Sequence, residues 1–171
     1  MLNGYSGEIA IMPDLAWLNA LPDGDAVEVL LGCCAAPGWA RAVAGGRPYA
    51  SAGDLLAAAD AAWAAREPGD LEAAMAGHPR IGERRLSGWS QAEQSGVGSD
   101  AETARALRHA NAAYEERFGH VFLICATGRG PAEILAELQR RMANGPDAER
   151  EVAAAEIGKI NAIRLRKLVT P

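Results

Sequence analysis

The sequence predicts an all-α protein, a single-domain multi-helix bundle with short connections that spans residues 1–171. Its length of 171 residues corresponds to one domain. Hydrophobic residues make up 49% of the chain but aromatic residues only 5%, so alanine, leucine, isoleucine and valine must form most of the core. Apolar residues recur at helical spacing in most segments, and proline, glycine and aspartate interrupt the pattern at short intervals. These observations favour short helices packed on one another.

The first half of the chain contains predicted helices that proline and glycine separate. A capping box of Ser51 and Asp54 begins one of them, because a serine side chain can accept a hydrogen bond from the amide three residues on. The predicted helices run from Pro13–Asp14 to Leu21, over 25–34, from Pro37 to Gly45–Gly46, from Ser51 to Pro68–Gly69–Asp70, and from there to just before His78.

The second half begins with loops and continues with a long helix. Residues 79–88 and 95–99 are rich in glycine and serine, which predicts loops. Asp100 is expected to cap a helix that runs to Phe118. Asn111 interrupts the apolar stripe of this helix. Because a buried amide needs hydrogen-bond partners, Asn111 is expected either to brace the backbone or to reach a functional site.

One short apolar segment near 120–127 does not follow a helical pattern. It is continuous, bounded by glycines and without an evident partner strand, so an isolated extended stretch is expected there. Pro131 suits the first position of a helix over 131–143, because proline has no amide hydrogen to leave unpaired. The last helix is expected from about Asp147 to Leu168.

Charge, cysteine content and missing motifs exclude several classes of function. The net charge is −5 and no stretch is strongly basic, which argues against nucleic acid or an anionic membrane surface as a partner. No apolar run of about 18 residues and no signal peptide are found, so a cytoplasmic protein without a membrane span is expected. Cys33, Cys34 and Cys125 form neither a spaced metal pair nor an even disulfide set, and they are interpreted as buried thiols. The absence of P-loop, GxGxxG, HExxH and nucleophile-elbow motifs argues against nucleotide enzymes, zinc proteases and α/β-hydrolases.

The densest set of chemically useful side chains lies just before the long helix. His78 precedes Pro79, which disfavours helical dihedrals at His78 and sets the imidazole on a stiff corner. Ser90, Glu93 and Gln94 stand at i, i+3 and i+4, so one helical turn would point all three to one side. Such an arrangement can hold and protonate a small polar molecule. The alternative is a loop histidine beside an ordinary capping box, which needs no ligand.

The last predicted helix carries a charge on its apolar face. At about 100° per residue, this face contains Ile157, Ile160 and Leu168, and Arg164 falls among them. A buried guanidinium is too costly unless it is paired. Its partner would be a protein carboxylate such as Glu93 or the carboxylate of a ligand, held bidentately. The alternative is an arginine that extends to solvent at the edge of the domain.

Four motifs in order resemble one family, and the match covers nearly the whole chain. They are Gly77-His78-Pro79; Ser90-x-x-Glu93-Gln94; Asn111-x-x-Tyr114 with Phe118-Gly119-x-Val121-Phe122-Leu123-Ile124-Cys125-Ala126; and Ile160-x-x-Ile163-Arg164-Leu165. Together they are similar to the OHCU decarboxylases (2-oxo-4-hydroxy-4-carboxy-5-ureidoimidazoline decarboxylases) of urate degradation. The chain departs from many members at Arg80-Ile81, where they have Asp-Leu, and at His120-Val121, where they have phenylalanine and proline.

The resemblance implies an all-helical, cofactor-free enzyme, usually a homodimer, that forms (S)-allantoin and holds no metal. The family's catalytic histidine corresponds to His78, its acidic partner to Glu93 and its carboxylate-binding arginine to Arg164. Its substrate contacts fall on Pro79, Ser90 and Gln94 and on the backbone of Phe122, Leu123, Ile124, Cys125 and Ala126.

The chemistry of this small anionic substrate agrees with those residue types. Loss of CO₂ leaves an electron pair, which the ring C=N next to the carboxylated carbon can accept without a metal or an organic cofactor. The protein then has to orient the substrate, exclude water and deliver a proton to one face. Histidine suits that delivery near neutral pH, and Glu93 would either hold His78 in its useful tautomer or accept the hydroxyl proton.

Two other functions remain compatible with parts of the sequence. One is a metal-dependent hydrolase that uses His78 and Glu93 with His109 or His120, although the histidines lack ligand spacing. The other is a helical ligand-binding or interaction module without chemistry, which an alanine-rich helical chain alone would permit.

Overall fold

The computed structural model describes residues 14–78 and 97–170, and within these ranges the regular elements are all helices. Their bounds are α1 Leu15–Ala20, α2 Asp23–Cys33, α3 Pro37–Gly45, α4 Ala52–Ala64, α5 Pro68–Ala76, α6 Val97–Phe118, α7 Pro131–Arg141 and α8 Pro146–Val169. The prediction of an all-α fold is therefore confirmed. None of the helices described is both long and apolar enough to span a membrane.

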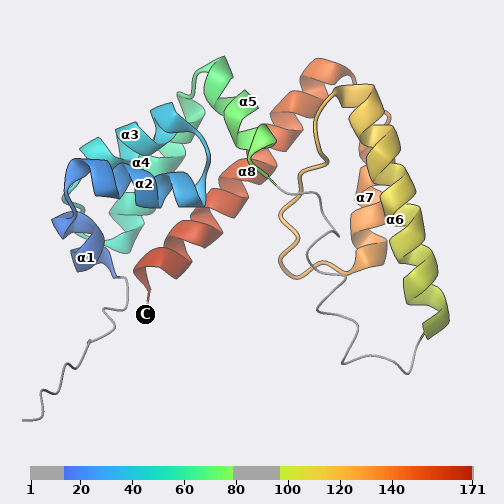
Figure 1. The fold of residues 1–171 in the computed structure, drawn as a ribbon, viewed down its shortest axis with the longest axis horizontal. Helices are drawn as coiled ribbons and strands as arrows, with labels where there is room; N and C mark the ends of the chain where they lie inside the picture. Colours follow the sequence, from blue (N-terminus) through green and yellow to red (C-terminus); the bar gives the residue numbers. More distant parts are fainter. Residues whose placement is uncertain (1–13, 79–96, 171) are drawn as a thin grey trace, which may run out of the picture.

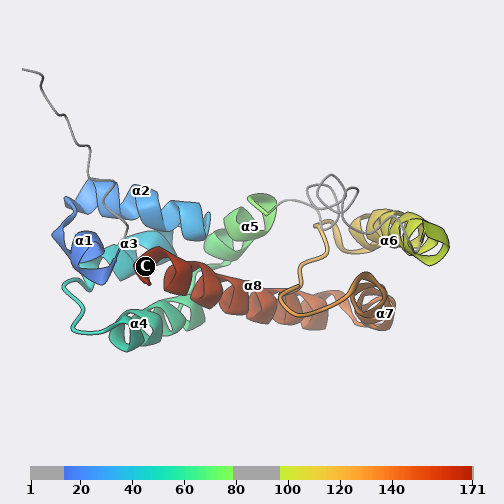
Figure 2. The same cartoon turned by 90° about the horizontal axis from the view of Figure 1, so that it is seen from below.

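The helices form two groups that α8 joins. In Figure 1, α1–α4 lie at one end of the molecule and α6 and α7 at the other, while α8 runs diagonally between them. α4 packs on α8 in the first group, and α6 packs on α7 in the second. Seen from below (Figure 2), α5 lies between the two groups. The middle of the molecule is thus formed by α5 and α8, each from a different part of the sequence.

The larger core lies among α1–α5 and α8, and we call it the large core. Its side chains are mainly aliphatic. Two tryptophans add hydrogen bonds to backbone carbonyls: the indole N–H of Trp39 donates to Ala59 O over 3.0 Å, and that of Trp63 donates to Ala154 O over 2.8 Å. The leucine and isoleucine side chains buried there without any exposed surface are Leu18, Leu30, Leu55, Ile157 and Leu165.

A second cluster, which we call the small core, lies between α6, α7 and the segment that follows α6. The Tyr114 ring packs edge-on against the Phe122 ring, with 5.1 Å between the ring centroids. The buried members of this cluster are Leu107, Tyr114, Phe122, Ile124, Ile134 and Leu138.

Residues 121–126 separate the two cores. Phe122 and Ile124 are buried in the small core, whereas Leu123 between them is buried in the large core. Val121 packs against the large core and Ala126 against the small core, so the pattern continues at both ends. Side chains that alternate between two sides are those of an extended chain. The extended segment expected near 120–127 is therefore confirmed.

Two helix boundaries differ from those expected. The sequence predicts a break around Asp23–Asp25, but α2 begins at Asp23 and both aspartates lie in its first turn. Carboxylates stabilise that position because the helix dipole is positive there. The loop predicted over 95–99 is wrong for its last three residues, because α6 begins at Val97. Asp100 is therefore inside the first turn of α6 rather than at its cap.

Candidate active site

His78 lies at a sharp turn directly after α5. Gly77 ends that helix, and a Cβ atom at Gly77 would lie 2.6 Å from the Ala35 Cβ, so only glycine fits where α5 meets the connection between α2 and α3. The imidazole Nδ1 of His78 is 2.6 Å from the carbonyl oxygen of Ala74. The side chain is buried, with 8% of its surface exposed.

The backbone contact fixes the tautomer of His78. Because a carbonyl oxygen only accepts hydrogen bonds, Nδ1 must carry the hydrogen that Ala74 accepts. Nε2 is buried and has no hydrogen-bond partner among residues 14–78 and 97–170. Burial lowers the pKa of His78 below its ordinary value of 6.5; the Ala74 carbonyl opposes this shift, and the positive charge of Arg164 adds to it. His78 is therefore neutral near pH 7, with a free lone pair on Nε2.

Arg164 approaches the same region from α8. Its Nη1 donates to the carbonyl oxygen of Cys33 over 2.7 Å, at the last residue of α2. Arg164 also lowers the pKa of His78, so the guanidinium and the imidazole lie in one electrostatic environment. Within residues 14–78 and 97–170, no carboxylate forms an ion pair with Arg164.

Arg164 is half-buried rather than central in the apolar stripe, which corrects the prediction from the helical wheel. The buried residues of α8 follow each other at intervals of four, and positions four residues apart differ by about 40° around the helix axis. The side of α8 that other elements cover therefore shifts gradually from one end of the helix to the other. Different elements cover the two ends of α8, so Arg164 lies at an edge of this face near its C-terminal end. The buried row runs through Glu149, Ala153, Ile157, Asn161, Leu165 and Val169.

Asn161 is a buried polar residue that the sequence reasoning missed. Asn161 is 3% exposed, and in the part of the chain that the structure describes neither amide atom has a hydrogen-bond partner of good geometry. It nevertheless lies close to Cys34: burial raises the pKa of that thiol to about 11, and Asn161 and Arg164 partly oppose the rise. The sequence carries a signal for it, because Asn161 interrupts a row of apolar residues just as Asn111 does in the preceding long helix.

The extended segment is largely buried between the two cores. Phe122, Leu123 and Ile124 are buried, and Cys125 and Ala126 are half-buried. The side chains of Phe122 and Ile124 pack in the small core, and that of Leu123 packs in the large core. Asn111, for which the sequence left two roles open, is buried on α6.

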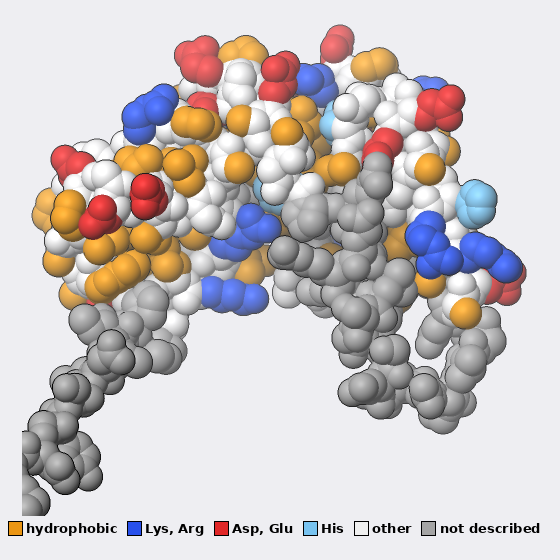
Figure 3. All heavy atoms as spheres, viewed as in Figure 1, with side chains coloured by type: hydrophobic (Ala, Val, Ile, Leu, Met, Phe, Trp, Pro, Cys, Tyr) orange, Lys and Arg blue, Asp and Glu red, His pale blue; other side chains and the backbone are white. Residues whose placement is uncertain are grey.

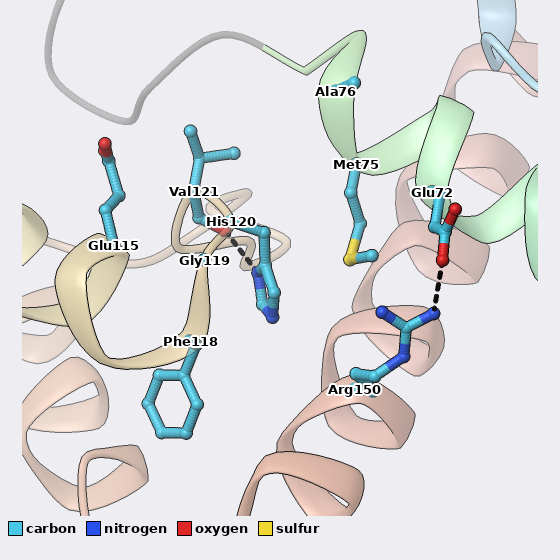
Figure 4. A pocket seen from close by; sticks show the side chains of 9 residues that line it. All are labelled: Glu72, Met75, Ala76, Glu115, Phe118, Gly119, His120, Val121 and Arg150. Carbon is cyan, nitrogen blue, oxygen red and sulfur yellow. Dashed lines mark hydrogen bonds and ion pairs between the residues drawn. The ribbon is translucent and has the colours of Figure 1, made fainter.

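A pocket opens between α5, the end of α6 and the N-terminal part of α8. Its volume is about 560 Å³, and Figure 4 shows side chains from α5, from the end of α6 and from α8 around it. Glu72 and Arg150 close one side with an ion pair of 3.5 Å. His120 contributes a buried Nε2, which no described residue hydrogen-bonds. The pocket includes Met75 and Ala76, close in the chain to His78, but neither His78 nor Arg164 lines it.

Some positive charge lies on the surface near this region. Figure 3 shows Lys and Arg side chains on the concave side of the molecule, near the lower part of α8. Pro79, Ser90, Glu93 and Gln94 lie outside the described residues. In the part of the chain that the structure describes, no group of three histidine, cysteine, aspartate or glutamate side chains is arranged to hold a metal ion.

Comparisons with known proteins agree on one family. The family model described as OHCU decarboxylase matches residues 19–166. The chain is 35% identical over 138 residues to 2-oxo-4-hydroxy-4-carboxy-5-ureidoimidazoline decarboxylase of Amia calva, which covers 76% of this chain and 79% of that protein. It is 32% identical to the protein of the same name in Mus musculus, with 91% and 93% covered. It is also 32% identical to uric acid degradation bifunctional protein TTL of Arabidopsis thaliana, with 80% and 45% covered.

Two solved structures share the fold. A crystal structure of OHCU decarboxylase in the presence of (S)-allantoin superposes with a TM-score of 0.72 at 27% identity, covering 88% of this chain and 100% of that chain. A crystal structure of (S)-allantoin synthase gives a TM-score of 0.70 at 20% identity, covering 92% and 54%, and shows the fold alone.

Proposed function

Since the chain belongs to the OHCU decarboxylase family, we propose that His78 and Arg164 carry out the family reaction, the decarboxylation of OHCU to allantoin in urate degradation. The chain is accordingly a carboxy-lyase. The observation that carries the assignment of His78 is its fixed tautomer: Nδ1–H donates to Ala74, and Nε2 is buried with its lone pair free.

The free Nε2 matches what the reaction requires. When CO₂ leaves carbon 4, the electron pair of the broken C–C bond forms a double bond between carbon 4 and carbon 5. The π electrons of the C5=N bond then pass to the ring nitrogen. This nitrogen takes a proton from solvent. The product at this stage is an enol. Neutral His78 accepts the hydroxyl proton of carbon 4 at Nε2 and returns it to carbon 5, so that carbon 4 becomes a carbonyl. Because one side chain moves one proton, the new hydrogen arrives on a single face.

Arg164 is proposed to bind the carboxylate that leaves as CO₂. Its Nη1 is anchored on Cys33 O, which fixes the planar fork. Within residues 14–78 and 97–170 no other group binds Nε or Nη2, so both atoms can serve a ligand. Two parallel hydrogen bonds to a carboxylate would hold the C–CO₂ bond in one orientation. The alternative is a structural role only, because a cation also stabilises the carbonyl end of α2.

Further substrate contacts rest on the family resemblance. We propose that Pro79, Ser90 and Gln94 contact the substrate, and that Glu93 either orients His78 or accepts the hydroxyl proton. The backbone of Phe122, Leu123, Ile124, Cys125 and Ala126 is proposed to contribute hydrogen bonds. A homodimer and a cytoplasmic location are proposals of the same kind; sedimentation of the purified protein tests the first, and the free thiols of Cys33, Cys34 and Cys125 are compatible with the second.

The test is formation of allantoin from OHCU, generated from urate with urate oxidase and the hydrolase that follows it, and measured by circular dichroism. His78→Asn should lower kcat by about 10²–10⁴-fold, the usual range for acid–base catalysis. Asparagine can still donate to Ala74 O, so the turn should remain folded. His109→Asn, at an exposed histidine of α6, is the matched control. More than half the activity left in His78→Asn would remove His78 from the mechanism, and loss of activity with EDTA would favour a metal-dependent reaction.

A further inference from the structure

The connection between α2 and α3 is short and is fixed by its own hydrogen bonds. It consists of Cys34, Ala35 and Ala36, between the end of α2 and the start of α3. The N–H of Cys34 donates to Leu30 O over 3.0 Å, and the N–H of Ala36 donates to Cys34 O over 2.8 Å. Cys34 and Ala36 have no exposed surface. The methyl group of Ala35, which lies between them in the chain, is therefore attached to backbone that has little room to move.

Arg164 of α8 binds the chain directly before this connection. Its Nη1 donates to the carbonyl oxygen of Cys33, the last residue of α2, over 2.7 Å. Asn161, one turn earlier in α8, lies beside the connection itself: burial raises the pKa of the Cys34 thiol, and Asn161 and Arg164 both oppose this rise. The position of the Arg164 guanidinium is thus set relative to the connection between α2 and α3.

The end of α5, which carries His78, touches the same connection. A Cβ atom at Gly77 would lie 2.6 Å from the Ala35 Cβ, whereas two carbon atoms pack at about 3.5–4.0 Å. The N–H of His78 donates to Met75 O over 3.3 Å, and its Nδ1–H donates to Ala74 O over 2.6 Å. Because these bonds tie the imidazole to the last turn of α5, any shift of that turn moves His78 as well.

The first turn of α5 is attached to α3. Asp70 Oδ1 accepts a hydrogen bond from the Gly38 N–H over 2.8 Å, near the start of α3. This bond satisfies an amide that has no partner within its own helix. Since α5 is held near its start by Asp70, the whole helix cannot easily tilt to relieve a steric clash at Gly77. The displacement would fall on the last turn, next to His78.

We propose that Ala35 and Gly77 are positioning residues, whose close contact sets the place of the His78 imidazole. Because Arg164 binds at the same connection, this contact also sets the distance between the imidazole and the guanidinium. The inference rests on the proposed function, since that distance matters only if His78 and Arg164 act on one substrate. A displacement of about 1 Å can cost about 10²-fold in rate when a proton has to reach one particular atom.

The first test enlarges Gly77. Its φ is −79°, so alanine fits this backbone, and Gly77→Ala adds a methyl group whose nearest neighbour is the Ala35 Cβ. The variant should lower kcat about 10–100-fold, whereas KM should change much less because Arg164 still binds the carboxylate. Gly32→Ala in α2 is the matched control, because a Cβ there meets no atom of the described residues within 4 Å. A wild-type kcat in Gly77→Ala would overturn the proposal, even if the melting temperature falls.

The second test changes the opposing methyl group. Ala35→Gly combined with Gly77→Ala leaves one methyl group at the contact, as in the wild-type protein, and should restore kcat to within about 3-fold. Ala35→Gly alone leaves the last turn of α5 less well fixed and should lower kcat about 3-fold. This variant adds no atoms, so it tests the proposal even if Gly77→Ala does not fold. A double variant as slow as Gly77→Ala, or a wild-type kcat in Ala35→Gly, would contradict the proposal.

The third test follows the imidazole by NMR and needs no substrate. The His78→Asn variant identifies the Cε1–H resonance of His78 among those of the three histidines. This resonance should shift in Gly77→Ala and return in the double variant, while that of His109 stays unchanged. An unchanged His78 resonance in Gly77→Ala would show that the contact does not position the imidazole. The proposed function fails separately, if the wild-type protein does not convert OHCU or if His78→Asn remains active.

Discussion

The large core and the small core fill the space between helices with different chemistry. In the large core, leucine, isoleucine and alanine side chains pack between α1–α5 and α8, and Trp39 and Trp63 donate to backbone carbonyls. In the small core, the ion pair of Arg141 and Glu149 lies without exposed surface, and the Tyr114 hydroxyl donates to the same carboxylate.

The difference follows from the backbone conformation of the segments that border each core. The large core joins regular helices, whose backbone groups are satisfied within each helix. The small core borders an extended segment, whose backbone groups need partners from elsewhere, and Arg141 supplies one of them at Leu123 O. The fully buried ion pair of Arg141 and Glu149 therefore accompanies irregular backbone, and it lies next to the segment proposed to bind substrate.

The largest effect on stability is expected from breaking the ion pair of the small core. Glu149→Leu leaves Arg141 buried without a carboxylate, which should reduce the free energy of unfolding by about 3–5 kcal/mol in urea titration. Combining it with Arg141→Met should recover part of the loss, because no buried charge is then left unpaired. Glu151→Leu, which removes the exposed partner of Arg66, should change stability by less than about 0.5 kcal/mol. A loss below about 1 kcal/mol for Glu149→Leu would mean that the pair is not central to this core.

The next largest effect is expected on kcat/KM, from a change at Arg164 of α8, the helix that joins the two groups. Arg164→Lys keeps the charge but removes the planar fork, so kcat/KM should fall about 10–100-fold, equal to about 1.4–2.7 kcal/mol of transition-state stabilisation. The melting temperature should change little. Arg166→Lys, at an exposed arginine of the same helix, is the control. Normal kinetics with a large drop in melting temperature would leave Arg164 as a structural cap of α2.

A smaller effect shows whether the aliphatic parts of the two cores are equivalent. Ile157→Val in the large core and Ile134→Val in the small core each remove one buried methyl group. Each should lower the free energy of unfolding by about 0.5–1.5 kcal/mol. Equal losses would assign the difference between the cores to the ion pair, whereas a much larger loss at Ile134 would mean that the small core is also packed differently.

The smallest effect is a pH dependence from His78. Its pKa is lowered in the folded protein, so the unfolded chain binds a proton first as the pH falls. The stability that neutral His78 contributes is fully present above its ordinary pKa of 6.5 and is lost as the pH falls toward the lowered value. Between about pH 7 and about pH 5 the melting temperature of the wild-type protein should therefore fall more than that of His78→Asn. Parallel curves for the two proteins would show that His78 is not buried as a neutral group.

The sequence by itself determined the helices, the extended segment and the turn at His78. Each depends on residues close together in the chain: Pro37, Pro68 and Pro131 begin helices, and a continuous apolar run between glycines marks residues 121–126. Motif order also selected His78 and Arg164, and the structure brings both into one electrostatic environment. The boundaries of α2 and α6 were less well determined, because acidic residues near a helix start can cap it, lie inside it or precede a break.

Only the tertiary structure decided which charges are buried and which atoms of the site are free. In the sequence, Arg141 and Glu149 resemble ordinary surface charges, and only the turn between α7 and α8 brings them together. The tautomer of His78 depends on the carbonyl of Ala74, and the half-buried position of Arg164 depends on how other helices cover α8. The physical reason is that local periodicity reports the backbone conformation, whereas burial and hydrogen bonding depend on atoms that distant elements supply.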